Sequence, residues 1–112
     1  MNKQLEFLIM LHDLDLLLDE INHEKKAGFE IKKHKEELQT AREKVKKGLE
    51  VILSNKYERL SKRYGKAIVP VIDGICYGCF VTLPSAFVVR KNKNEEVSTC
   101  QNCGRFIYWF ED

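Results

Sequence analysis

The sequence predicts an α+β protein, in which an N-terminal antiparallel helical hairpin, a short coiled coil, precedes a small C-terminal β-domain built around four cysteines. Two observations lead to this fold class. Residues 1–66 contain no proline and carry apolar residues at helical spacing, whereas residues 67–112 contain all four cysteines and short extended segments. We therefore divide the chain after residue 66. A chain of 112 residues is long enough for one small domain, or for two modules that share little core.

The first helical segment has the apolar periodicity of a coiled coil. Its seam has spacings of three and four residues and consists of Phe7, Met10, Leu14, Leu17 and Ile21. Leu11 and Leu18 widen the same face. A weaker repeat of the same kind runs through residues 31–64 and includes Ile52, with Gly48 inside it as a local weak point.

Two arrangements fit this pattern near Gly28. A turn there gives a hairpin with a longer second arm, whereas a continuous helix would pair with another chain, because the heptad phase continues past Gly28. The continuous helix would place charged residues such as Lys35 and Arg42 at core positions. Residues 1–27 carry three basic and six acidic groups, net −3, and residues 28–66 carry twelve basic and six acidic groups, net +6. Opposite charges favour the hairpin, and the apolar surface that two helices leave uncovered predicts self-association.

The four cysteines form two CxxC pairs. Cys76 and Cys79 make the first pair, and Cys100 and Cys103 follow after twenty residues. Each CxxC turn places two thiolates on one tight loop, so two such loops complete a tetrahedral set of sulfurs around one ion. Gly78 lets backbone amides turn toward the sulfurs. We predict one structural Zn²⁺ per chain, with no coordination position left for water or substrate.

Other roles for four cysteines are less consistent with the sequence. Two disulfides need an oxidising compartment, and nothing in the chain indicates export. A redox CxxC belongs at a strand-to-helix junction and needs no second matching pair. Iron fits the same four sulfurs as zinc, so the choice between these metals stays open.

We expect extended segments around both cysteine pairs. The expected elements are a strand over residues 67–75, its continuation over residues 80–83, a helical turn over residues 84–89, and strands over residues 95–99 and 105–110. Pro70 marks the first strand as an edge strand or as a strand start. Phe106 and Tyr108 are expected in the core, since so small a domain packs its aromatics around the metal site. Trp109 is expected either to pack there or to contact a partner.

Basic side chains gather on one helical face before the β-domain. Lys56, Arg59, Arg63 and Lys66 have spacings of three and four residues, with Lys62 beside them, and a later loop adds Arg90, Lys91 and Lys93. A phosphate-binding stripe and an ordinary solvated helix face both fit this pattern. Trp109 beside the basic loop would suit a stacking platform for single-stranded nucleic acid.

Two longer motifs surround the cysteines. Gly74 precedes a C-x-G-C-F turn over residues 76–80, and a C-x-x-C-G-R turn over residues 100–105 is followed by Ile107 and Tyr108. Residues 64–110 thereby resemble the bacterial coiled-coil/C4-type zinc-ribbon family. The resemblance implies a helical hairpin bearing a zinc ribbon, the four cysteines as ligands, and nucleic-acid binding. Some members are linked to flagellar or secretion-system gene expression through partners such as the alternative sigma factor of the nitrogen-regulation type. Members usually carry a much longer coiled coil, so only the ribbon and its adjacent helix transfer.

The sequence therefore favours a non-enzymatic zinc-ribbon adaptor that binds RNA or DNA in transcription or RNA control. The alternative is a protein-interaction module that docks a protein such as a transcription factor, or a second copy, through Leu14 and Leu17, with Trp109 as a further contact. We recognise no catalytic triad, acid pair or phosphate loop, and expect no small-molecule substrate. The apolar run near the start is interrupted by Glu6 and followed by Asp13, which is unlike a signal peptide or membrane span, so we expect a cytoplasmic protein.

Overall fold

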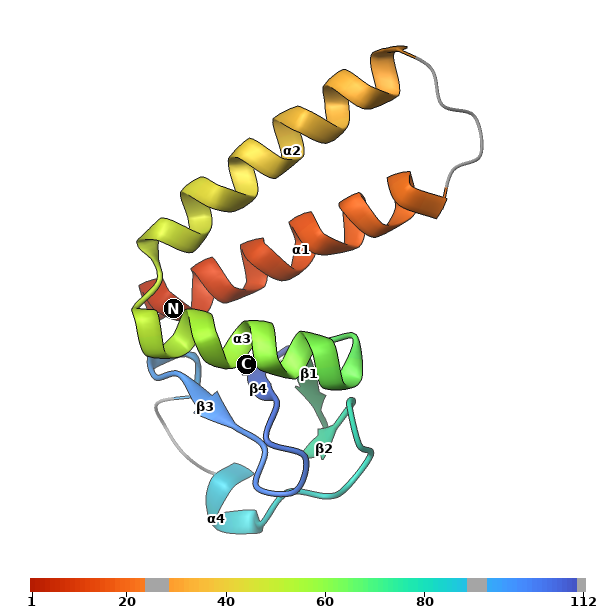
Figure 1. Cartoon of the computed structure of the whole chain (residues 1–112). Helices are drawn as coiled ribbons and strands as arrows, with labels where there is room; N and C mark the ends of the chain where they lie inside the picture. Colours follow the sequence, from red (N-terminus) through yellow and green to blue (C-terminus); the bar gives the residue numbers. More distant parts are fainter. Residues whose placement is uncertain (24–28, 89–92, 111–112) are drawn as a thin grey trace.

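The computed structural model of the protein describes residues 1–23, 29–88 and 93–110 (Figure 1). Within them three helices precede a small four-stranded sheet, which confirms the predicted α+β fold. The helices are α1 (Lys3–His23), α2 (Phe29–Gly48), α3 (Val51–Tyr64) and α4 (Ser85–Val88), with the 3-10 helix η1 (Lys93–Glu95). The strands are β1 (Ile68–Ile72), β2 (Ile75–Cys76), β3 (Ser98–Thr99) and β4 (Phe106–Trp109). None of the described helices is long and apolar enough to span a membrane.

The first two helices form the predicted hairpin. Figure 1 shows α1 and α2 running in opposite directions, with their far ends projecting away from the sheet. The hairpin is therefore the correct choice of the two arrangements, although Gly28 itself lies outside the described residues.

The second helical segment is two helices, so the prediction of one arm through Gly48 is wrong. Here α2 ends at Gly48, and α3 turns away to lie over the sheet (Figure 1). A Cβ on Gly48 would lie 2.9 Å from Cε2 of Phe7, so a larger residue at this elbow would force the Phe7 ring to shift. The Gln4 side chain clamps the elbow, because its Nε2 donates to the Gly48 carbonyl at 2.9 Å and its Oε1 accepts from the Glu50 N–H at 2.8 Å. These bonds satisfy backbone groups that helix ends leave without an intrahelical partner.

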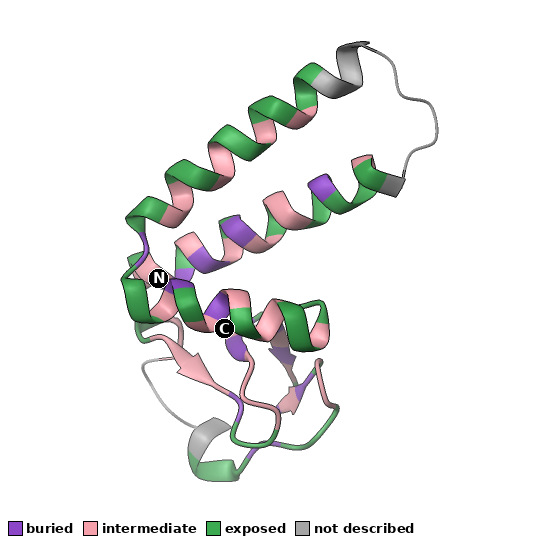
Figure 2. Ribbon diagram, viewed as in Figure 1, coloured by how far each residue is buried: buried purple, intermediate pink, exposed green. Residues whose placement is uncertain are grey.

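The main core joins the helices to the sheet (Figure 2). Its buried members are Leu5, Leu8 and Leu11 of α1, Leu49 and Tyr57, and Ala67, Ile68 and Phe106 of the β-domain. The predicted heptad seam is only partly right as a packing face, since Met10 and Leu17 are 46% and 45% exposed. Ile52, expected to be apolar core, is largely exposed as well. The reason is that α1 packs against α3 and the sheet as well as against α2. Its buried face is therefore formed by Leu5, Leu8 and Leu11.

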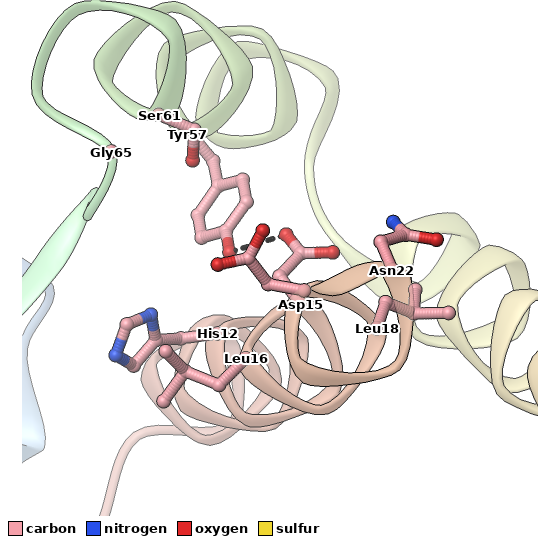
Figure 3. Close-up of a pocket in the computed structure, with 9 residues that line it drawn as sticks. His12, Asp15, Leu16, Leu18, Asn22, Tyr57, Ser61 and Gly65 are labelled. Atoms are coloured by element: carbon pink, nitrogen blue, oxygen red, sulfur yellow. Dashed lines mark hydrogen bonds between the residues drawn. The ribbon is translucent and has the colours of Figure 1, made fainter. Parts of the chain in front are cut away.

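A half-buried arginine joins all three long helices. Arg42 of α2 donates through Nε to Asp15 of α1 at 2.6 Å and pairs with Glu58 of α3. The Tyr57 hydroxyl donates to the second Asp15 oxygen at 2.7 Å (Figure 3). Burial, followed by the hydrogen bond to Asp15, raises the pKa of Tyr57, so it stays a donor. Arg42 therefore occupies an inward position in the hairpin because its charge is paired there.

The sheet has the strand order β2-β1-β4-β3, with β1 and β4 parallel and the outer pairs antiparallel. The expectation that Pro70 marks an edge strand or a strand start is wrong, because it lies within the inner strand β1. Pro70 is tolerated because β2 pairs only with Val71 and Ile72, and the Pro70 carbonyl accepts from the Tyr77 N–H at 3.0 Å. The predicted long strand reverses at Asp73 and Gly74, whose φ angles of 51° and 73° give a two-residue hairpin turn.

Replacing Leu8 by alanine tests the shared core. Leu8 is fully buried between α1 and the elements below it, so Leu8→Ala should lower the free energy of unfolding by about 2–5 kcal/mol. The matched control is Leu17→Ala on the same helix, which should cost less than about 1 kcal/mol because Leu17 is half exposed. Urea denaturation of both variants checks this, and equal losses would contradict the core described above.

Candidate metal centre

The four cysteine sulfurs converge at one end of the sheet. All four lie within 4.8 Å of one another, with Cys76 to Cys103 at 3.9 Å and Cys79 to Cys100 at 3.8 Å. A tetrahedral ion with metal–sulfur bonds of about 2.3 Å separates its ligands by about 3.8 Å, whereas a disulfide needs about 2.05 Å. The cysteines are unpaired with one another, and their donor set suits one structural Zn²⁺.

Two similar backbone turns hold these sulfurs. In the first, the Phe80 N–H donates to the Cys76 carbonyl at 2.7 Å, and in the second the Gly104 N–H donates to the Cys100 carbonyl at 2.9 Å. The residue after each pair has a left-handed backbone, with φ of 61° at Phe80 and 78° at Gly104. The hairpin at Asp73 and Gly74 joins the first cysteine turn to strand β1. At the start of that turn, the Cys76 N–H donates to the Val81 carbonyl at 3.1 Å.

Backbone N–H groups, including that of Gly78 as predicted, donate hydrogen bonds to the cysteine sulfurs. Burial raises the pKa of Cys76, opposed by the backbone N–H groups of Cys79 and Gly78. Burial also raises the pKa of Cys103 to about 12, opposed by the Arg105 N–H. At Cys79 burial raises the pKa, but bonds from the Asn102 side chain and the Val81 N–H outweigh it and bring the pKa down to about 6. Because a metal binds cysteines as thiolates, its binding opposes the raised pKa of Cys76 and Cys103 and releases their protons.

A second apolar cluster packs around the sulfurs. Its buried members besides cysteine are Val69, Val71, Leu83, Ile107 and Trp109. Trp109 is 7% exposed, and its backbone N–H and carbonyl are bonded by the Asn94 side chain at 2.8 and 2.9 Å. Its ring therefore packs in the core, with Lys93 Nζ 5.1 Å from the ring centroid. Phe106 is buried and Tyr108 packs against the main core, so both contribute to a core as predicted, but to the one shared with the helices and not to the cluster around the sulfurs.

The predicted basic stripe lies on the outer side of α3 and just beyond it. Arg59, Lys62, Arg63 and Lys66 are exposed, whereas Lys56 is half-buried with its Nζ 5.5 Å from the Phe106 ring centroid. Arg90 and Lys91 lie outside the described residues, so only Lys93 of the basic loop can be placed. Leu14 is half-buried on α1.

The sequence interpretation missed an exposed aromatic pair on the first cysteine turn. Tyr77 and Phe80 have ring centroids 5.6 Å apart and point away from the core. It also missed that Arg105 stacks on Tyr64, with Cζ 4.1 Å from the ring centroid, beside Arg63 at 5.2 Å. The sequence did contain a signal for the exposed ring of Phe80. Phe80 directly follows Cys79, whereas Gly104 fills the equivalent position after Cys103.

A groove of about 430 Å³ lies between α1 and α3 (Figure 3). Its lining includes His12, Asp15, Asp19 and Tyr57. Asp15 already bonds Arg42 and Tyr57, and burial lowers the pKa of His12 so that its imidazole is neutral at pH 7. We therefore interpret this groove as a gap between packed helices and not as a ligand site.

Comparison with known proteins agrees with the metal geometry. Residues 75–107 match the model of the C4-type zinc ribbon domain. This segment is a C4-type zinc ribbon. No curated protein matches the chain.

Two solved structures resemble most of the fold. CT398 from Chlamydia trachomatis is 26% identical, with a TM-score of 0.60 over 71% of this chain and 34% of that one. The HP0958 protein from Helicobacter pylori is 23% identical, with a TM-score of 0.63 over 74% of this chain and 35% of that one. The matched part thus spans about a third of either relative, and the second likeness concerns the fold alone.

Removing one ligand tests the structural role of the metal. Cys100→Ser should reduce zinc content well below one ion per chain and cost about 4 kcal/mol or more of stability, since loss of a metal is among the most destabilising single changes. Gln101→Ser is the matched control, because Gln101 is exposed on the same turn and is expected to keep both zinc and stability. Native mass spectrometry and thermal denaturation measure the two effects. Full zinc occupancy in Cys100→Ser would contradict a four-sulfur site.

Proposed function

We propose that the protein is a non-enzymatic zinc-ribbon adaptor that binds RNA or DNA through the exposed cations of α3 and the adjoining ribbon. The observation that carries this proposal is the basic outer face of α3, formed by Arg59, Lys62 and Arg63 of the helix and by Lys66 just beyond its end. It lies opposite the buried Tyr57, whose side of the helix packs on the core. Among the described residues no ion pair joins any of these four cations to a carboxylate, which leaves their charge available for phosphates.

Contacts with the ribbon hold the basic face of α3 in a fixed position. Lys56 lies over the Phe106 ring and Arg105 over Tyr64, so cations from both parts of the chain are held against aromatic rings. The setting we propose is transcription or RNA control, with flagellar or secretion-related expression as the case that the family resemblance suggests. Four reduced thiols suit a reducing compartment, so we place this role in the cytoplasm.

Charge reversal on α3 tests the proposal. The double variant Arg59→Glu, Arg63→Glu should weaken binding of a fluorescein-labelled mixed-sequence RNA and flatten the dependence of log K on log salt by at least about 1.4, for two lost contacts to a single strand. The matched control Lys44→Glu, Lys47→Glu changes the same net charge at exposed positions of α2. Fluorescence anisotropy across a salt series measures both. Salt-insensitive binding, or equal loss in the control, would contradict the proposal.

The exposed face of α1 favours a second candidate, a protein-interaction module. Glu6, Met10, Asp13, Leu17 and Glu20 have spacings of four and three residues and are all exposed, so carboxylates alternate with apolar side chains along one stripe. A helix that carries apolar residues between basic ones would complement this stripe, and the exposed Lys44 and Lys47 of a second copy are one source of such charge.

Leu17→Asp tests this second candidate. If the α1 stripe joins two copies, the variant should sediment as a monomer at concentrations where the unaltered protein is oligomeric, while still binding one zinc. Val51→Asp places the same charge at another exposed apolar position, at the start of α3, and is expected to leave the oligomer intact. Analytical ultracentrifugation compares the three proteins, and an oligomer unaffected by Leu17→Asp would exclude the stripe as the contact.

A further inference from the structure

The outer side of the first cysteine turn exposes two aromatic rings. Phe80 is 69% exposed and Tyr77 43% exposed, with their ring planes tilted by 57°. Val81 beside them is 41% exposed. In a ribbon that uses Phe106, Ile107 and Trp109 to build its cores, these rings add little to the packing.

The backbone at Phe80 makes this exposure costly. Its φ of 61° is left-handed, which is unfavourable for any residue with a side chain. Gly104 holds the equivalent position of the second turn with φ of 78° and makes the same backbone hydrogen bond. Glycine would therefore serve the fold better at position 80. A strained and exposed phenyl ring is the pattern of a residue kept for contact with a ligand.

Cations continue from this turn to α3. The Arg105 side chain lies against Gly78, where a Cβ would collide with its guanidinium group. The same guanidinium stacks on Tyr64, and Arg63 lies over that ring as well. Aromatic rings and cations thus follow one another from Phe80 and Tyr77, through Arg105, to the basic face of α3.

We propose that Tyr77 and Phe80 are a stacking platform for the bases of single-stranded nucleic acid, whose phosphates pass along Arg105 and Arg63 onto α3. This inference rests on the proposed function and names its substrate class. Bases inside a duplex are stacked on one another and cannot cover the rings, whereas those of a single strand can. The adjacent cations favour this partner over an apolar protein surface, because phosphates follow each base at regular intervals. The platform is therefore not Trp109, which is buried.

Replacing Phe80 by glycine separates binding from folding. Phe80→Gly should retain one zinc and an unchanged or higher melting temperature, because glycine relieves the left-handed backbone. Its affinity for a 15-nucleotide oligo(dU) should fall by about 5- to 150-fold, with an unchanged salt slope, since the lost ring carries no charge. Tyr77→Ala should act in the same direction. Phe110→Gly, which removes another exposed ring at the end of β4, is the matched control and should bind normally.

A duplex of the same length completes the experiment. The unaltered protein should prefer the single strand, and Phe80→Gly should lose that preference. If oligonucleotides bind in a salt-dependent manner but Phe80→Gly and Tyr77→Ala bind as well as Phe110→Gly, the platform is overturned while the proposed function stands. Loss of zinc or of stability in Phe80→Gly would overturn it by making the ring structural. If no oligonucleotide binds, both proposals fail together.

Discussion

Four thiolates within 4.8 Å of one another repel strongly unless a cation lies between them. The chain prepares for that cation with two matching turns and with N–H groups directed at the sulfurs, so the metal completes a site that the backbone has already shaped. The buried cysteines, Cys76 and Cys100, belong to the same apolar cluster as Ile107 and Trp109. Loss of the metal should therefore destabilise β1 and β4, and with them the core that these strands share with α1 and α3.

Polar side chains complete the junction between helices and ribbon. Asn2 caps α1 by accepting from the Gln4 and Leu5 N–H groups at 2.8 and 3.1 Å, while its own N–H donates to the Asn94 carbonyl at 2.7 Å. The Asn94 side chain in turn pairs with the Trp109 backbone, so the start of α1 is tied to β4. The far end of the hairpin has no sheet beneath it (Figure 1). The paired charge of Arg42 lies nearer the elbow, where it joins α2 to Asp15 of α1 and Glu58 of α3. Strong anchoring at one end thus leaves a projecting arm.

Local sequence signals predicted the hairpin and the metal ligands, because heptads and CxxC pairs act through neighbouring residues. The break at Gly48 escaped prediction because Phe7 and Gln4, more than forty positions away, determine it. The pairing of Arg42 with Asp15 and the exposure of Leu17 likewise follow from how three helices share one core. The reversal at Asp73 and Gly74 was readable, since this dipeptide favours a two-residue hairpin. At the candidate binding face the cations were predicted, but which aromatic rings are exposed depends on a buried Trp109 and a left-handed Phe80.

In the function we propose, the first turn of the ribbon and the outer face of α3 form one nucleic-acid-binding surface. The most direct test is a titration of zinc-loaded, ¹⁵N-labelled protein with a short single-stranded RNA, followed by amide chemical shifts. We expect the largest shifts at Tyr77 and Phe80 and along Arg59 to Lys66, with small ones at Met10 and Leu17. Shifts confined to the α1 stripe, or none at saturating RNA, would contradict this binding surface.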